Sequence, residues 1–161
     1  MTQLDLRDIQ TLADLQAALG HFTSGAQEGL RVAETEIRQA QEWLQERIDH
    51  WQRELEQARR EVAQAEAELR RCQASGYRDD RGRYHQPDCS AYVRALARAE
   101  AHLRECQGYL ETAQEWRSRV DQAANEYQRE ARRLSEVAGG HTEKARAFLG
   151  RAAEKYEEVR T

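Results

Sequence analysis

Proline is almost absent from this chain of 161 residues, and the single one, Pro87, lies near the middle. A stretch without proline can form a long unbroken helix, because proline removes a backbone donor and clashes with the preceding turn. No apolar run approaches the ~20 residues that a membrane-spanning helix needs. Residues 1–19 lack the basic start and the continuous apolar stretch of a signal peptide. We therefore expect no membrane span, and a cytoplasmic protein or one exported without a cleaved signal peptide.

Lysine is also scarce: Lys144 and Lys155 are the only two, and arginine carries nearly all the positive charge. Together with the many alanines, this usage is typical of a GC-rich bacterial genome. Charged residues make up 34% of the chain and the formal net charge is −4. An acidic chain repels phosphates, so we expect no nucleic acid among its partners. The abundant residues, Ala, Glu, Gln, Arg and Leu, are those of long helices.

The apolar residues of the two halves mirror each other about the middle of the chain. In each such pair the residue numbers add to 161, as in Leu69 with Tyr92, Ala65 with Leu96, Val62 with Ala99, Ala58 with Leu103, Leu55 with Cys106, Trp51 with Leu110, Ile48 with Ala113, Ile37 with Ala124, Leu30 with Ala131 and Leu12 with Leu149. Two antiparallel helices produce a constant sum, because each step along one is matched by a step back along the other. The steps of three and four within each half follow a coiled-coil seam.

The mirror pattern predicts an all-α fold: a long antiparallel helical hairpin, or coiled coil, with short helices at both termini. Glycines mark the expected breaks, namely Gly20, Gly25 and Gly29 at one level and Gly139-Gly140 at the matching one. We predict one domain over 1–161, made of an N-terminal helix at 4–22, a first long arm at 26–75, a hairpin loop at 76–88, a second long arm at 89–138 and a C-terminal helix at 142–160.

Aromatic residues gather on the middle of both arms, partly outside the seam. Two hairpins that pack together into a four-helix bundle would cover such a face, and exposed aromatic patches usually mark interfaces. The alternative is that these rings only widen the core of the hairpin. The interface candidates are Trp43, Trp51, Tyr109 and Trp116.

Cys72 and Cys89 obey the mirror rule and face each other at the last seam layer before the loop. A disulfide there would close a loop of 16 intervening residues and would indicate an oxidising compartment. Two reduced cysteines that pack as small core residues fit the spacing equally well. Cys106 lies in the seam opposite Leu55, and we expect it to be a plain buried residue.

No motif in the chain indicates catalysis or a cofactor. The side chains of Cys72, His85, Asp88 and Cys89 are of metal-ligating types, but they lack the C-x-x-C or H-x-H spacing of zinc sites. None of the histidines is predicted to lie beside a nucleophile, and no phosphate-binding glycine loop or nucleophile elbow is present. We expect no enzyme activity, metal, cofactor or small-molecule substrate.

The central loop, GYRDDRGRYHQPD, is rich in turn-forming residues and is expected to form a short β-like ribbon or a compact loop. Tyrosine and arginine are favoured at binding hot spots, so the loop is a candidate recognition tip, although a merely solvated turn explains the same composition. The tip candidates are Tyr77, Arg78, Arg81, Arg83, Tyr84 and His85.

A small all-α hairpin with tryptophans on its arms resembles the Trp-X-Gly and LXG-type helical hairpins of bacterial type VII secretion. The resemblance lies in the architecture, since Trp43 is followed by Leu44-Gln45 and Trp51 by Gln52-Arg53, without the Trp-x-Gly turn. It implies a non-enzymatic interaction module: an adaptor, chaperone or secretion-associated targeting protein that binds a helical partner or effector. The alternative is a structural scaffold or spacer that self-assembles in a larger particle.

Overall fold

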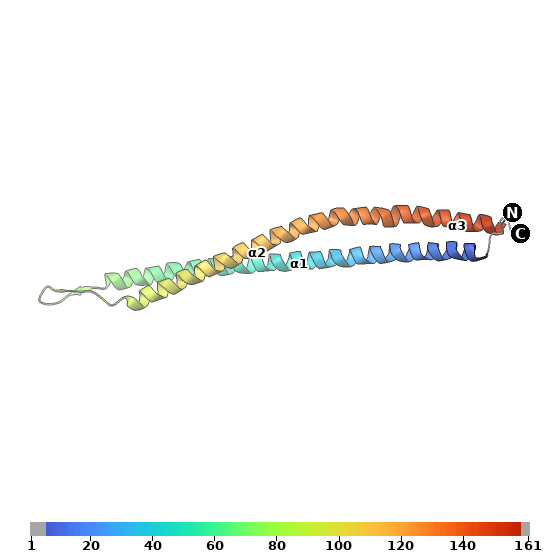
Figure 1. Cartoon of the computed structure of the whole chain (residues 1–161). Helices are drawn as coiled ribbons and strands as arrows, with labels where there is room; N and C mark the ends of the chain where they lie inside the picture. Colours follow the sequence, from blue (N-terminus) through green and yellow to red (C-terminus); the bar gives the residue numbers. More distant parts are fainter. Residues whose placement is uncertain (1–5, 159–161) are drawn as a thin grey trace. The chain divides into compact units, whose positions relative to one another are not determined.

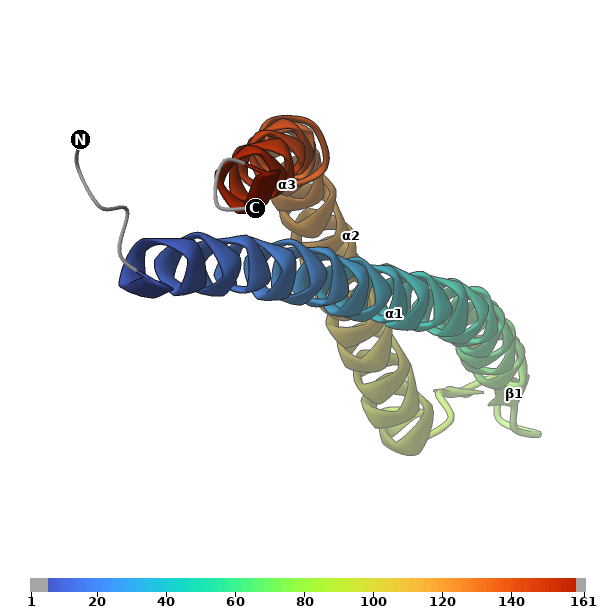
Figure 2. The same ribbon diagram turned by 90° about the vertical axis from the view of Figure 1, so that its right-hand side faces the viewer.

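The computed structural model describes residues 6–158 and shows a helical hairpin. Helix α1 (Leu6–Ala74) and helix α2 (Ser90–Glu136) are joined by two short strands, β1 (Tyr77–Arg78) and β2 (Tyr84–His85). A π-helix, η1 (Val137–His141), and helix α3 (Thr142–Glu158) follow. Figure 1 and Figure 2 show the strands between the end of α1 and the start of α2. The predicted all-α hairpin with a ribbon-like loop is therefore confirmed.

The described residues form two compact units. The first, which we call the hairpin unit, spans Ala40–Val120 and contains both strands. The second, the terminal unit, combines the described residues up to Gln39 with those from Asp121 onward. Within residues 6–158 no helix has an apolar stretch long enough to cross a bilayer.

The core of the hairpin unit is the seam that the mirror pattern predicts. Leu55, Ala58 and Cys106 are buried in one cluster, and the partly buried residues Trp51, Leu103 and Leu110 pack against it. Three mirror pairs thus meet in the same cluster. Ala58 has no exposed surface, because the small side chain lets the two helices approach closely.

An arginine interrupts this seam where an apolar residue is expected. Arg117 extends from α2 to α1, where its Nη1 donates to the backbone oxygen of Gln41 and to Oε1 of Gln45, both at 3.1 Å. A charged group inside a seam is tolerated only when its donors are satisfied. Leu44 and Ile48 of α1 remain buried at this level, so the seam continues past the arginine.

The predicted break between residues 22 and 26 is wrong, because α1 runs without interruption through this region. A glycine inside a helix costs roughly 1 kcal/mol relative to alanine. Packing outweighs that cost here: Thr23, between the glycines, is buried to 7% exposure and is held by hydrogen bonds. The predicted ends at residues 4 and 160 lie outside the described residues.

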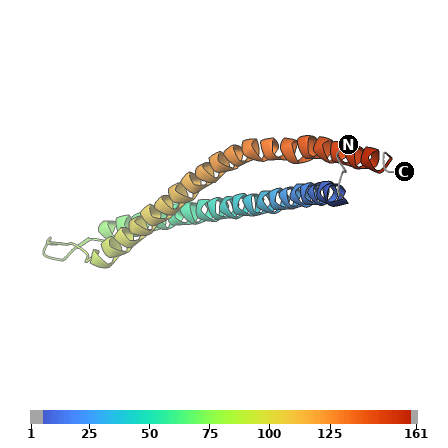
Figure 3. The same ribbon diagram turned by 45° about the vertical axis from the view of Figure 1, so that its right-hand side comes forward.

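The glycine pair at Gly139-Gly140 does not break the chain either. It sits in η1, from which α3 continues at Thr142, as Figure 3 shows for the last part of the chain. A π-helix holds an extra residue per turn and so absorbs a local mismatch without ending the helix. The predicted start of the C-terminal helix at residue 142 agrees with α3, but the predicted gap before it is occupied by the π-helix η1.

The two helices of the terminal unit contact each other on both sides of η1. Thr23 of α1 contacts Ala138 of η1, and the two numbers add to 161, as the mirror pattern predicts. Beyond η1, the side-chain ends of Arg146 and Gln16 reach Gly20 and Gly150 of the opposite helix. Leu12 and Leu149, the predicted outermost layer, are both half-buried in this region.

Two buried threonines secure the terminal unit at η1. Thr23 Oγ1 lies 2.9 Å from Thr142 Oγ1 and 3.2 Å from the backbone oxygen of Ala138, to which the Thr142 hydroxyl also donates. Both side chains are 7% exposed. This threonine pair satisfies a carbonyl that the altered helical turn presents to the neighbouring helix.

We expect Thr23→Val to lower the free energy of unfolding by about 1 kcal/mol, the usual net contribution of a buried hydrogen bond. The double variant Thr23→Val/Thr142→Val should lose less than the sum of the two single losses, because neither hydroxyl is then left unpaired. Urea unfolding followed by circular dichroism measures the free energy of unfolding of the two single variants and of the double variant. The control is Thr35→Val at an exposed site outside any proposed interface, and additive losses at Thr23 and Thr142 would contradict the pairing.

Candidate functional site: an aromatic groove and a β-hairpin tip

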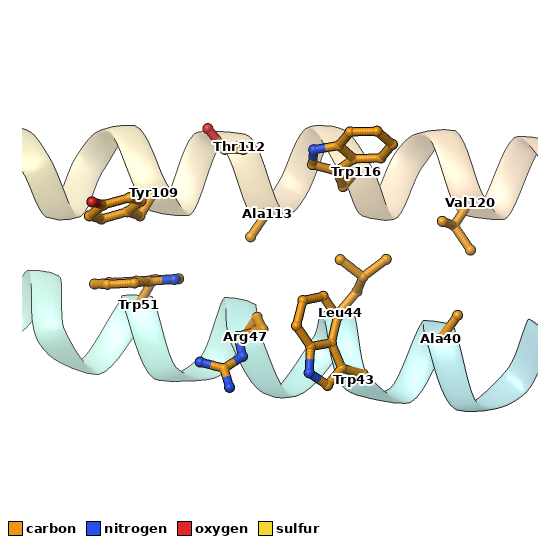
Figure 4. Close-up of a pocket in the computed structure, with 10 residues that line it drawn as sticks. All are labelled: Ala40, Trp43, Leu44, Arg47, Trp51, Tyr109, Thr112, Ala113, Trp116 and Val120. Atoms are coloured by element: carbon orange, nitrogen blue, oxygen red, sulfur yellow. The ribbon is translucent and has the colours of Figure 1, made fainter.

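An apolar groove lies between α1 and α2 in the hairpin unit. Its volume is about 480 Å³. Figure 4 shows the lining side chains, with Trp51 and Tyr109 facing each other and Leu44 and Ala113 between the helices. The lining residues are Ala40, Trp43, Leu44, Arg47, Trp51, Tyr109, Thr112, Ala113, Trp116 and Val120. We call this surface the aromatic groove.

The four interface candidates all line the aromatic groove, but they do not have equal roles. Trp43 and Trp116 are 55% and 53% exposed, and Tyr109 is 46% exposed. Trp51 is half-buried and stacks on Tyr109, with ring centroids 4.5 Å apart and an interplanar angle of 23°. Trp51 also packs against the core cluster. The structure thus assigns Trp51 to the core, and Trp43 and Trp116 to the free surface.

Each exposed indole carries a guanidinium from its own helix. Arg47 lies over the ring of Trp43, 5.4 Å from its centroid, and Arg119 lies over Trp116 at 5.3 Å. Such a cation–π contact is worth about 0.5–1 kcal/mol at an exposed site. The sequence analysis missed both arginines. The available signal was their spacing, since Trp43 and Arg47 are four residues apart and Trp116 and Arg119 three.

A cysteine, a histidine and a glutamate form a line just beyond the groove, and the sequence analysis missed it as well. His102 Nε2 lies 3.5 Å from Cys106 Sγ, and His102 Nδ1 lies 3.3 Å from Glu61 Oε2. The expectation that none of the histidines neighbours a nucleophile was wrong. The spacing of four residues between His102 and Cys106 on one helix was the signal that could have revealed it.

This line of three residues does not have the properties of an active nucleophile. Cys106 is 1% exposed, so no substrate reaches its sulfur. Burial raises the pKa of the Cys106 thiol, and the nearby carboxylates of Glu54 and Glu105 raise it further. A catalytic cysteine needs the opposite, a lowered pKa and an accessible thiolate. The expectation that Cys106 is a buried seam residue is confirmed.

The loop between the long helices forms an ordered β-hairpin tip. Strands β1 and β2 pair antiparallel, with Tyr77 opposite His85 and Arg78 opposite Tyr84. The Asp79 carboxylate accepts hydrogen bonds from the backbone N–H groups of Arg81 and Arg83 at 3.0 and 2.8 Å. It also lies 3.0 Å from Arg83 Nε and from His85 Nε2. Asp79, which was not among the predicted tip residues, thus organises the turn.

The predicted tip residues divide into supporting and displayed groups. Arg83 and His85 bind Asp79, and His85 also stacks on Tyr77 with ring centroids 4.9 Å apart. Tyr84 lies so close to Gly76 that a β-carbon there would collide with its ring. The side chains of Arg78 and Arg81 are exposed and lie outside the Asp79 network, to which Arg81 contributes only its backbone N–H. The tip is therefore a preformed surface of arginines and tyrosines.

Cys72 and Cys89 are bonded at the base of the tip, with Cα atoms 5.9 Å apart. The structure thus selects the disulfide from the two alternatives that the spacing left open. Both sulfurs are used in this bond, so they are not available as ligands beside His85 and Asp88. Among residues 6–158, no three His, Cys, Asp or Glu side chains are grouped to hold a metal ion.

We expect the order of the tip to be lost in acid. The hydrogen bond from His85, and then those from the Arg83 and Arg81 backbone, hold the pKa of Asp79 below its usual range. A carboxylate with a lowered folded-state pKa stabilises the fold above its unfolded pKa of about 3.9, and this contribution disappears as the pH falls through the folded value. Amide NMR shifts of Gly82 and Arg83 should therefore change below about pH 4. Asp79→Asn should remove that transition, and an unchanged transition would contradict the assignment.

Comparisons with known proteins identify no relative of this chain. No protein-family model matches it, and neither curated proteins nor solved structures include a significant match. The function must therefore be inferred from the groove and the tip themselves.

Proposed function

We propose that this chain is a non-enzymatic helical interaction module that acts by burying its aromatic groove against another helical surface. In this proposal it works as a bacterial adaptor, chaperone or secretion-associated targeting protein, and its ligand is a protein. The observation that carries the proposal is the pair of exposed indoles, Trp43 of α1 and Trp116 of α2, in a groove whose buried lining includes Leu44 and Ala113.

The chemistry of the groove supports a helix as its ligand. Tryptophan, tyrosine and arginine are the residues most enriched at binding hot spots, and all three line the groove. On α1 the lining runs from Ala40 to Trp51, about three helical turns or roughly 17 Å. A trough of this length with an apolar floor suits the apolar face of an amphipathic helix.

The disulfide supports one of the two proposed compartments. The bond between Cys72 and Cys89 favours the exported alternative, because structural disulfides persist in oxidising environments and are rare in the cytosol. In the proposal the ordered tip is then held in shape outside the cytoplasm, where it provides a second contact surface.

A structural scaffold remains the second candidate, and one observation favours it. The terminal unit also exposes large apolar side chains, since Leu15 and Phe22 are 48% and 46% exposed and Phe148 is 65% exposed. Several exposed apolar surfaces on one chain favour self-assembly into larger particles. Light scattering that gives concentration-dependent assemblies larger than a dimer would support this candidate over the adaptor.

Site-specific photo-crosslinking in living cells tests the proposed function. A photoreactive p-benzoylphenylalanine replaces Thr112, which lines the groove, and in a control it replaces Gln52, an exposed residue outside the lining. We expect one discrete protein adduct from position 112 and none from position 52. The absence of any adduct at position 112, or the same adducts from both positions, would overturn the proposal.

A further inference from the structure

We infer that the occupant of the aromatic groove is a second copy of this chain, packed antiparallel about a twofold axis. This inference rests on the proposed function, because it assigns the partner of the same surface. A twofold interface brings one patch against itself, so each residue must be compatible with its counterpart in the other copy. The charges around the groove meet this requirement only in the antiparallel arrangement.

The two ends of the groove carry opposite charges. The tryptophan end has the guanidiniums of Arg47 and Arg119 above the indoles. The other end, beyond the Trp51–Tyr109 stack, has the carboxylates of Glu54 and Glu105. Both carboxylates act on the pKa of Cys106 there, and Tyr109 Oη donates to Glu105 Oε1 at 3.3 Å. A copy turned end to end places each cationic end against an anionic one.

The positions of these charges define one axis. On α1, the midpoint between Arg47 and Glu54 lies between residues 50 and 51. On α2, the midpoint between Arg119 and Glu105 is Thr112. The stack of Trp51 on Tyr109 sets these residues at one level, so the two midpoints differ by about two and a half residues, or roughly 4 Å along the helices. A single twofold axis there pairs Arg47 with Glu54 and Arg119 with Glu105 of the other copy.

The side chains concerned are free to form these pairs. Arg47 is exposed and lies over Trp43, and Glu54 is half-buried. Arg119 forms an ion pair with Glu115 of its own helix, where both side chains are 61% exposed, and such an exposed pair is worth little. In the dimer the indoles contribute the apolar contact area, and the four charges select the antiparallel register. The result is an antiparallel four-helix arrangement in the hairpin unit.

Charge reversal in two complementary variants tests this arrangement. In R47E/R119E all four of these positions are acidic, and in E54R/E105R all four are basic. The wild-type chain of 18.7 kDa should give twice that mass by size-exclusion chromatography with light scattering. Each variant alone should give half the wild-type mass, because like charges then meet across the axis. An equimolar mixture of the two should restore the dimer mass as a one-to-one heterodimer.

Two controls keep the outcomes distinct. R60E/R104E makes the same change in net charge as R47E/R119E, at exposed positions outside the groove, and should remain dimeric. Circular dichroism of every variant checks that the helices are intact. A monomeric wild-type chain, or variants that stay dimeric, or a mixture that does not pair, would overturn the second-copy assignment. If Thr112 nevertheless crosslinks to a different protein, the proposed function survives and only this inference fails.

Discussion

Replacing Trp51 by alanine should lower the free energy of unfolding by about 2–3 kcal/mol, the largest loss we expect from a single aromatic substitution. Truncation of a fully buried tryptophan costs roughly 3–5 kcal/mol, and Trp51 is half-buried. Its ring packs against the core of Leu55, Ala58 and Cys106 and stacks on Tyr109. Alanine would remove both contacts and leave a cavity in a seam that consists largely of small residues.

The matched control is Trp43→Ala, which removes the same side chain from a site that is 55% exposed. This variant should lose less than about 1 kcal/mol, because surface substitutions and exposed cation–π contacts have small effects. Urea unfolding followed by circular dichroism compares the two, at a concentration where light scattering gives the monomer mass. Equal losses at both positions would show that Trp51 is not a core residue.

Removal of the disulfide has the second large effect that we expect. The Cys72–Cys89 bond closes a loop of 16 intervening residues, and closure of a loop of this length contributes about 3 kcal/mol in the chain-entropy model. The double variant Cys72→Ser/Cys89→Ser should therefore have a free energy of unfolding lower by that amount, and its urea midpoint should fall accordingly. Reductant should shift the wild-type protein in the same way and leave the double variant unchanged.

A thiol count provides an independent measurement of the same bond. The chain has three cysteines, so the denatured oxidised protein should contain one reactive thiol, that of Cys106, and the reduced protein three. Three thiols in protein isolated without reductant would contradict the bond and, with it, the exported alternative. One thiol in protein trapped by alkylation in cells would place the bond in the native compartment.

The groove shows why its residues could be predicted only in part. The four aromatic candidates were recognisable because they lie together near the middle of both arms. Their separation into a core ring, Trp51, and exposed rings, Trp43 and Trp116, depends on how the two helices rotate about the seam. The positions of Arg47 and Arg119 over the indoles depend on side-chain conformations that a residue pattern does not specify.

The sequence by itself determined the antiparallel hairpin, because a constant residue sum admits only one register between two helices. The Leu55–Cys106 layer and the facing positions of Cys72 and Cys89 follow from that register, and both are present. Only the tertiary structure decided the formation of the disulfide, the continuity of α1 past its glycines and the π-helix at Gly139-Gly140. The physical reason is that local propensities of about 1 kcal/mol per glycine are overruled by contacts between the helices, such as the buried pair of Thr23 and Thr142.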